Sequence, residues 1–143
     1  MSEEELPLFV HWMEFLDWLL SRTEKFPRSV RLSISNRIEA LALDILEEII
    51  EARYRRDRLP VLRAINLRLE KLRVLLRICH GRGYLHHDGY EYGVRQLATA
   101  GRMIGGWIRS LEAGADRSDK APANAGQDRP DSHGICRSAG KSR

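Results

Sequence analysis

Apolar residues recur at intervals of three and four positions through most of the first 112 residues, and this spacing predicts α-helices. Breaks that contain proline or glycine divide the pattern into four segments. These predicted helices span about residues 8–24, 28–56, 59–81 and 88–112. Short connections between amphipathic helices favour an all-α, antiparallel four-helix bundle. We therefore predict one bundle domain over residues 1–113, followed by a tail over residues 114–143.

Each predicted helix has a main apolar stripe, which identifies its candidate core face. The stripes are Phe9, Trp12, Met13, Leu16, Leu19 and Leu20; Ile34, Ile38, Leu41, Ala42, Ile45 and Ile49; Leu62, Ile65, Leu69, Leu72, Leu76 and Cys79; and Val94, Leu97, Ala98, Ile104 and Ile108. Asp88, with Glu91 three positions later, resembles a capping box at the start of the fourth helix. Gly101, Gly105 and Gly106 each weaken a helix by roughly 1 kcal/mol relative to alanine. We expect these glycines to be retained for close packing against a neighbouring backbone.

The composition narrows the class of protein. Hydrophobic residues make up 43% of 143 positions, which is enough for a core, and glycine and proline are scarce before residue 80. Cys79 and Cys136 do not form a disulfide framework and the first residues are acidic, so we expect a reducing, cytoplasmic location. No apolar run approaches the ~18 residues of a membrane span. Small, polar and charged residues dominate from Gly114 onward, which predicts a disordered tail.

Further apolar residues lie on the helix faces opposite the main stripes. Leu32, Leu43, Leu46 and Ile50 share one side of the second helix, Leu67, Val74 and Ile78 share one side of the third, and Trp18 stands alone among polar residues of the first. A bundle of one chain buries a single stripe per helix, so a second stripe predicts a homo-oligomer. The interface candidates are Trp18, Leu32, Leu43, Ile50, Leu67, Val74 and Ile78. The alternative is a scatter of exposed aliphatic residues, which soluble proteins also carry.

Charge is distributed unevenly along the chain. Residues 53–82 hold ten basic residues and two acidic ones, whereas residues 1–52 hold five basic and eleven acidic residues. Guanidinium groups form paired hydrogen bonds with phosphate oxygens, so this block predicts a surface that binds nucleic acid without reading its sequence. The candidates are Arg53, Arg55, Arg56, Arg58, Arg63, Arg73 and Arg77. The alternative is a solvated face that pairs with the acidic first half of the chain, in the same or a neighbouring subunit.

Two further patterns suggest chemistry. Arg73 with His80, and Arg82 with His87, resemble the arginine–histidine spacing of small all-helical ribonucleases, in which histidine transfers protons beside a scissile phosphate. His80 also suits a helix end, where a cation meets the negative end of the helix dipole. Adjacent side chains such as His86 and His87 point apart, so they do not predict a metal site. We expect no catalytic set, no metal and no cofactor.

Three ordered motifs carry a resemblance to a known family. They are Lys25–Leu32 followed by Asn36–Ile38, Leu69–Arg73 leading to Arg77, and Gly101–Ile108. Together they resemble the accessory variability determinant proteins of diversity-generating retroelements. These proteins belong to a wider four-helix-bundle family that includes proteins encoded within intervening sequences of ribosomal RNA. The resemblance covers roughly residues 8–112 and separates the two branches less well than it identifies the family.

The resemblance implies a function beyond what the residues alone indicate. Such proteins form a ring of five bundles with a basic surface, bind nucleic acid and partner the retroelement's reverse transcriptase. That enzyme copies a template RNA with errors at adenines, and the cDNA diversifies a target gene. The expected partners are therefore the reverse transcriptase, template RNA and further copies of this chain, with DNA as a further candidate. We expect neither a membrane partner nor an active site. On this basis Arg73 and Arg77 belong to the basic surface. A ribonuclease using Arg73 and His80, or a scaffold of the intervening-sequence branch, is the alternative.

Overall fold

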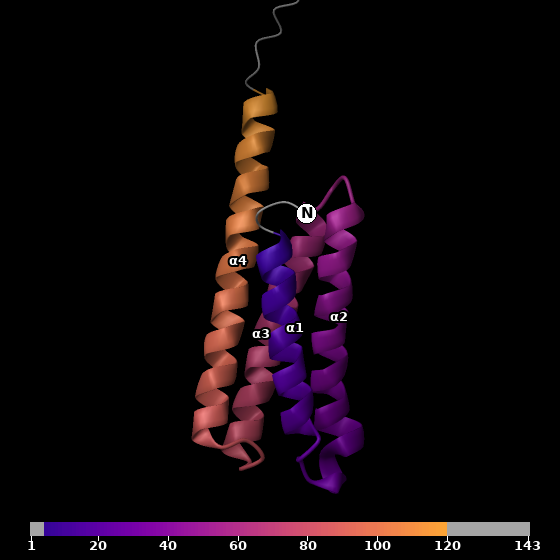
Figure 1. Ribbon diagram of the computed structural model, residues 1–143, viewed down its shortest axis with the longest axis vertical. Coiled ribbons are helices and arrows are strands. Elements are labelled where there is room, and N and C mark those ends of the chain that lie inside the picture. Colours follow the sequence, from indigo (N-terminus) through magenta and orange to yellow (C-terminus); the bar gives the residue numbers. More distant parts are fainter. Residues whose placement is uncertain (1–4, 120–143) are drawn as a thin grey trace, which may run out of the picture.

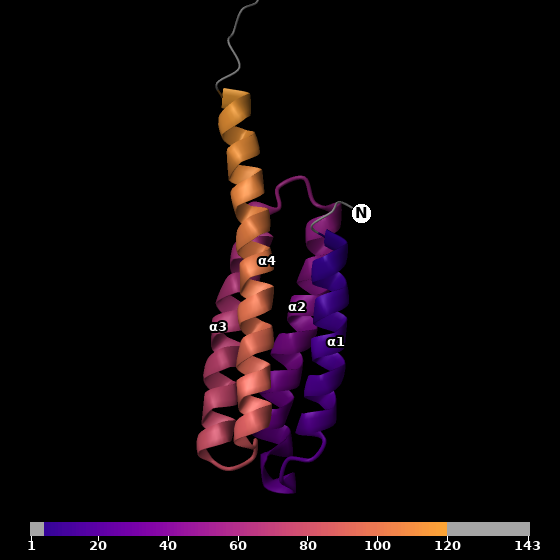
Figure 2. The same cartoon turned by 60° about the vertical axis from the view of Figure 1, so that its left-hand side comes forward.

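The computed structural model describes residues 5–119, and these residues form four α-helices. Helix α1 spans Glu5–Thr23, α2 spans Asn36–Tyr54, α3 spans Leu59–Gly81 and α4 spans His87–Asp119. Consecutive helices run in opposite directions, and α4 closes the arrangement by packing against both α3 and α1 (Figure 1, Figure 2). The predicted all-α, antiparallel four-helix bundle is confirmed.

The connection between α1 and α2 differs from the prediction of one continuous helix over 28–56. Pro27 has an extended backbone, with ψ at 145°, and a 3₁₀ turn over Arg28–Val30 and a π turn over Arg31–Ser35 precede α2. Proline lacks the N–H that a helix interior needs, so the helix starts anew after it. The wide π turn shifts the register of the side chains. Val30 and Ser35 therefore face the interior, while Leu32 is 88% exposed.

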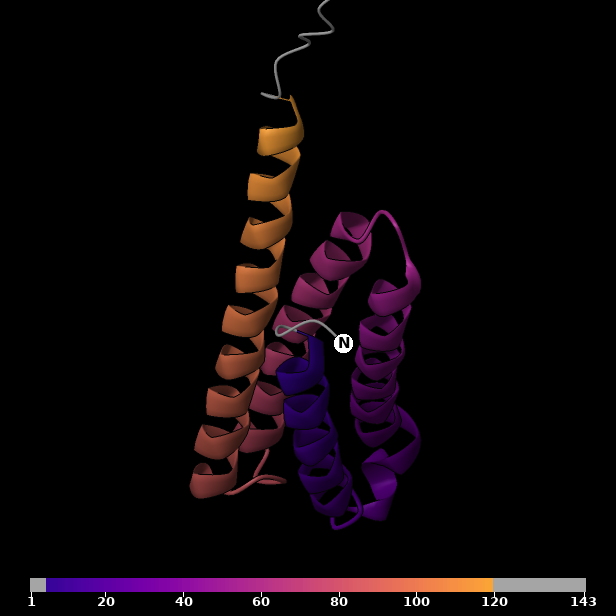
Figure 3. The same ribbon diagram turned by 45° about the horizontal axis from the view of Figure 1, so that its top comes forward.

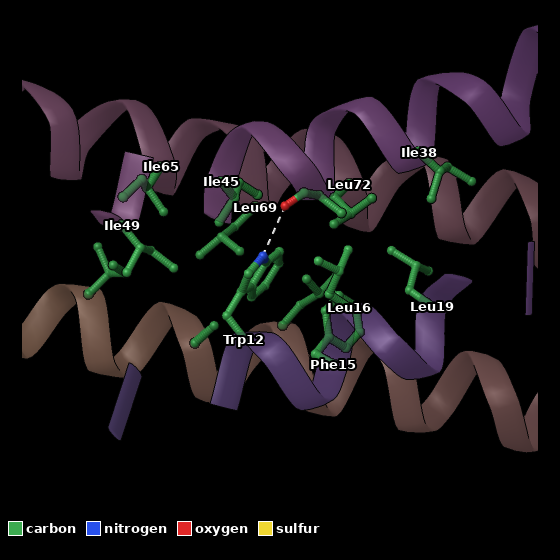
Figure 4. Close-up of a cluster of buried hydrophobic side chains, with 14 of the residues drawn as sticks. Trp12, Phe15, Leu16, Leu19, Ile38, Ile45, Ile49, Ile65, Leu69 and Leu72 are labelled. Carbon is green, nitrogen blue, oxygen red and sulfur yellow. Dashed lines mark hydrogen bonds between the residues drawn. The ribbon is translucent and has the colours of Figure 1, made fainter. Parts of the chain in front are cut away.

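The core runs along the centre of the bundle and contains residues from all four helices (Figure 4). The main stripe predicted for α3, from Leu62 to Cys79, is fully buried. Trp12 is fully buried too, and its indole Nε1 donates a hydrogen bond of 2.9 Å to the backbone oxygen of Ala42. This bond satisfies the polar atom of a large ring, which would otherwise be costly to bury. It joins α1 to α2 at the middle of the core.

The core face of α1 is rotated from the predicted one. Leu8 and Phe15, which the predicted stripe omits, are 1% exposed, whereas the predicted Met13 and Leu20 are 44% and 38% exposed. Helix α1 is apolar around most of its circumference, so periodicity alone does not select the buried side. Contacts with α2 and α4 select it. Met13 and Leu20 consequently add to the apolar surface of the molecule.

Helix α4 is longer than predicted. It continues to Asp119 and projects beyond the ends of the other helices (Figure 1, Figure 3), so residues 114–119 are helical where a disordered tail was predicted. Residues 120–143, the rest of that predicted tail, lie outside the described residues. Asp88 lies within the first turn of α4 and not at the predicted cap position. No helix within residues 5–119 is long and apolar enough to cross a membrane.

Candidate nucleic-acid interface

The structure separates the predicted arginines into two groups. Arg53, Arg55, Arg56 and Arg58 lie at or near the connection between α2 and α3, and Arg63, Arg73 and Arg77 lie on α3 itself. The first group surrounds the end of the bundle at which α1 begins (Figure 1). The second group follows the side of α3 next to α4. The two groups therefore have different surroundings, which decide how many of their guanidinium groups are available to a ligand.

Arg58 is occupied by the fold, which argues against its predicted role as a phosphate ligand. Its Nη1 forms an ion pair of 3.0 Å with Oε1 of the buried Glu5, and its other nitrogens donate to the backbone oxygens of Arg55 and Arg53. Its guanidinium also lies over the ring of Trp107. Arg58 thus ties the start of α1 to the α2–α3 connection and to α4. A charged group with this many partners is a structural clamp.

The remaining arginines at this end are more exposed. Arg55 pairs with Glu51 at 3.1 Å, one helical turn earlier, and Arg53 lies over the ring of Tyr54. In the described part of the chain, Arg56 forms no ion pair. An exposed pair such as Arg55–Glu51 contributes little to stability, about 0–1 kcal/mol. These three guanidinium groups can exchange their present contacts for a phosphate at small cost.

A groove of about 640 Å³ lies between α3 and α4, and we call it the α3–α4 groove. Its lining residues are Asn66, Leu67, Leu69, Glu70, Arg73, Leu97, Ala98, Gly101, Arg102, Gly105 and Arg109. Three arginines against one glutamate make the lining basic. Arg73 comes from the predicted block, but Arg102 and Arg109 come from α4 and were missed in the sequence prediction. The tertiary structure therefore joins two basic segments that are about thirty positions apart.

The missed arginines do leave a signal in the sequence. Arg95, Arg102 and Arg109 are spaced seven residues apart, which places them on the same side of α4, about 10.5 Å from one to the next at 1.5 Å per residue. This repeat lies outside the dense block at residues 53–82. It is informative only when combined with Arg73, and the sequence alone does not show that α3 and α4 present these residues to the same groove.

Carboxylates neutralise some of the arginines on this side of the bundle. Arg63 pairs with Glu112, Arg73 with Glu70 and Arg95 with Glu91. Within residues 5–119, no carboxylate forms an ion pair with the three other arginines of this side. These three are Arg77, Arg102 and Arg109. Arg102 donates a hydrogen bond of 3.1 Å to Oγ1 of Thr99, which leaves its positive charge uncompensated.

The glycines of α4 contradict the prediction of close packing. A Cβ atom added to Gly101 would meet nothing within 4 Å, and one added to Gly105 would meet only the guanidinium of Arg109, at 3.4 Å. The groove side of α4 is therefore open at these positions. Glycine weakens a helix interior, and no described neighbour requires it at Gly101 or Gly105. These two positions are therefore open to an occupant from outside the chain. They form a floor on which a ligand can approach the helix backbone.

An acidic surface lies on the opposite side of the bundle, on α2. Asp44, Glu47, Glu48 and Glu51 line a shallow hollow with Arg68 of α3. Glu48 Oε1 pairs with Arg68 Nη2 at 3.0 Å, but Glu48 Oε2 and Arg68 Nε are buried without a hydrogen-bond partner. Burial raises the pKa of Glu48 above its usual 4.5, although the charge of Arg68 opposes the shift. The acidic cluster of α2 and the arginines of the α3–α4 groove thus lie on different helices.

In the predicted ribonuclease patterns, the two histidines lie together, with the ring centroids of His80 and His87 5.7 Å apart. The His80 ring stacks on Tyr90 with centroids 4.6 Å apart, while Arg73 is held by Glu70 toward the preceding turn of α3. A hydrogen bond with the side chain of Tyr84 raises the pKa of Arg82. Within the described residues, neither arginine contacts the histidine with which it was matched. These contacts do not favour catalysis by either pattern.

The predicted interface residues are exposed in the single chain, with one exception. Leu32, Leu43, Ile50, Leu67, Val74 and Ile78 are between 43% and 88% exposed. Trp18, predicted to stand alone, is half-buried instead, and its ring lies 4.8 Å from that of Tyr92. Gly93 leaves room for the same ring. Helix α4 therefore covers Trp18. The prediction missed this contact because periodicity within α1 does not reveal a partner on another helix.

The fold and the groove together define an all-α, four-helix-bundle protein with a basic groove, the α3–α4 groove, between its last two helices. Residues 9–111 match the model of the bAvd-like family, so the chain belongs to this family of proteins like the bacterial accessory variability determinant. Family membership makes it an accessory protein of a diversity-generating retroelement, and members of the family are generally non-catalytic. No match is found among curated proteins.

Proposed function

We propose that this chain is a non-catalytic accessory subunit that binds the template RNA of its retroelement through the α3–α4 groove. The observation that carries the proposal is the pair of arginines, Arg102 and Arg109, which line the groove and have no carboxylate partner among residues 5–119. Arg73 faces them from α3. Unpaired guanidinium groups along a groove are a surface for phosphates, because each can bind two phosphate oxygens.

The binding mechanism follows from charge and shape. Each arginine that meets a phosphate releases condensed counterions, so affinity should fall steeply as salt rises. Gly101 and Gly105 lack side chains and allow a sugar–phosphate backbone to lie close to α4. Among the described residues, none that lines the groove is aromatic, which favours contacts with the backbone over base stacking. The same chemistry admits DNA as a second ligand.

Assembly and partner belong to the same proposal. Family membership and the exposed apolar residues of α2 and α3 support a ring of copies, as a homopentamer, that works with the retroelement's reverse transcriptase in the cytoplasm. A ring repeats the α3–α4 groove in every subunit. Several grooves on one RNA bind more tightly than one, since the later contacts form at a high effective concentration. The ring would thus hold template RNA for mutagenic cDNA synthesis.

The test is the salt dependence of binding to a fluorescent template RNA. Changing Arg102 and Arg109 together to alanine should weaken the salt dependence. The negative slope of log affinity against log salt should become shallower by roughly 0.7 for each lost contact with single-stranded RNA. The matched control changes Arg28 and Arg31, two exposed arginines of the α1–α2 connection, and removes the same charge.

Equal losses in the two double variants would show that the groove has no special role. No salt-sensitive binding by the wild-type chain would leave an oligomeric scaffold as the better description. Cleavage of the RNA, abolished by His80→Ala, would restore the ribonuclease alternative.

A further inference from the structure

Within the part of the chain that the structure describes, two separate apolar faces of the bundle remain uncovered. The first, the α1–α2 face, consists of Leu6, Val10, Met13 and Leu20 of α1 with Leu43 and Ile50 of α2, all 38–49% exposed. The second, the α3 face, consists of Leu67, Val74 and Ile78, all 44–57% exposed. Contiguous apolar patches of this kind on a single chain mark interaction sites.

The two faces lie on different sides of the molecule. On the α1–α2 side, Phe9 and Ile50 line a hollow between the two helices. On the other side, Val74 and Leu75 of α3 form a hollow of about 580 Å³ with Leu41 of α2. The two helices of the first face are neighbours, and α3 lies across the bundle from α1 (Figure 3). One partner molecule of small size cannot cover both faces together.

The α1–α2 face is bordered by acidic residues. Asp17 lies four residues after Met13 and three before Leu20, and Glu47 stands in the same relation to Leu43 and Ile50. Residues at these spacings are neighbours on a helix surface. Both carboxylates are exposed, and in the described part of the chain neither forms an ion pair. Exposed negative charges therefore lie beside the apolar residues of this face.

The α3 face is bordered by basic residues at matching positions. Lys71 lies four residues after Leu67 and three before Val74, and Arg37 of α2 lines the same hollow as Lys71 and Val74. Both cations are exposed and form no ion pair within residues 5–119. Glu70, the acidic neighbour, is paired with Arg73. The two apolar faces are therefore opposite in charge.

We propose that each face binds a second copy of this chain, with the α1–α2 face of one copy packed on the α3 face of the next. Opposite charges around two apolar surfaces favour this pairing and oppose pairing of either face with itself. The contact is head-to-tail, so each copy uses one face on each neighbour and the copies close into a ring or continue as a filament. This inference rests on the assembly in the proposed function and specifies its contact surfaces.

This pairing leaves the nucleic-acid surface accessible. Arg102 and Arg109 lie on α4, which belongs to neither apolar face. Only Leu67 borders both the α3 face and the α3–α4 groove. Each copy in the assembly therefore keeps its own groove open. Apart from Leu67, assembly and nucleic-acid binding use different residues and can be disrupted separately.

The test uses full-length protein and two variants, each with one altered face. Leu43→Asp places a carboxylate in the α1–α2 face, and Val74→Asp places one in the α3 face. Ser110→Asp, the control, adds the same group at an exposed position of α4 outside both faces. Sedimentation velocity gives the size of each protein and of an equimolar mixture of the first two. Circular dichroism melting checks the fold.

Wild type and Ser110→Asp should sediment as assemblies, and each altered-face variant should shift to the 16.5 kDa monomer. The mixture should form a one-to-one dimer, because each variant keeps the face that the other has lost. A mixture of folded variants that stays monomeric would overturn the pairing. The pairing would also be overturned if either variant assembled like wild type, or if the wild type were monomeric.

Exposed charges provide a second test if either aspartate variant melts well below the parent. Asp17→Lys alone and Lys71→Glu alone should each weaken assembly several-fold, because each opposes like charges across the contact. The double variant should recover part of the loss, and no recovery would contradict the charge pairing. RNA binding by the monomeric variants separates this inference from the proposed function, since their α3–α4 grooves are intact. A monomeric wild type that still binds RNA would refute the interface and the assembly, but it would leave RNA binding by the α3–α4 groove standing.

Discussion

Residues 87–112 of α4 form two halves, 87–99 and 100–112, that use glycine for opposite reasons. Near the start of the helix, a Cβ atom added to Gly93 would lie 3.1 Å from Leu76 and 3.3 Å from the Trp18 ring. Two turns later, Gly101 faces open space. In the first half, neighbouring side chains fill the space that a side chain at Gly93 would need. In the second half, no described residue fills the space beside Gly101. The same residue type in one helix thus marks close packing in one place and an open surface in the other.

The comparison separates what the fold needs from what it leaves available. The first half of α4 contacts α1 through Trp18 and Tyr92, and His11 Nε2 lies 3.0 Å from the backbone oxygen of Gln96. The second half borders the α3–α4 groove, with Arg102 and Arg109 unpaired among the described residues. A helix glycine that no described neighbour requires leaves the backbone open to an external occupant.

The largest expected effect is on stability at the packed half. Gly93→Leu should lower the free energy of unfolding by about 1–3 kcal/mol or more, because the new side chain overlaps Leu76 and Trp18. Chemical denaturation followed by circular dichroism measures the change. Gly101→Leu is the matched variant and should raise stability by up to about 1 kcal/mol through better helix propensity. Similar losses in both variants would remove the distinction between the two halves.

The next effect is on binding at the open half. Gly101→Leu fills the floor of the α3–α4 groove and should weaken RNA binding by on the order of tenfold, or about 1.4 kcal/mol. Gly114→Leu is the control, because Gly114 also lies in α4, has open space around it and is outside the groove. It should gain stability without losing affinity. Fluorescence anisotropy measures both variants, and unchanged binding by Gly101→Leu would show that the groove floor is not used.

The smallest effect sharpens the contrast between paired and unpaired charges. The pKa of Glu48 is raised in the folded state, so its protonated form favours folding. The stability that this group contributes is present below its ordinary pKa of 4.5 and is lost as pH rises through the folded value. Relative to Glu48→Gln, the wild type should become slightly less stable as pH rises from 4.5 through the folded pKa of Glu48. Urea titrations at several pH values measure the difference, and a parallel pH profile would contradict it.

Much of the fold could be predicted from local pattern. The stripe from Leu62 to Cys79 is entirely buried, as predicted, because it has six members and is the longer of the two apolar stripes of α3. The prediction for α1 failed at Met13 and Leu20, since that helix is apolar on several sides. The site was partly predictable: Arg73 lines the groove, but Arg58 is occupied by Glu5 and backbone oxygens. Such partners are distant in sequence and leave no local signal.

By itself, the sequence determined four helices, most of their buried stripes, an excess of apolar surface and an uneven distribution of charge. These properties depend on residues three or four positions apart, whose relation within a helix is set by its geometry. Only the tertiary structure decided which arginines remain unpaired, which glycines are open and which apolar residues α4 covers. Those outcomes depend on contacts between helices. In such contacts, two residues can be far apart in the chain and share one groove, as Arg73 and Arg102 do.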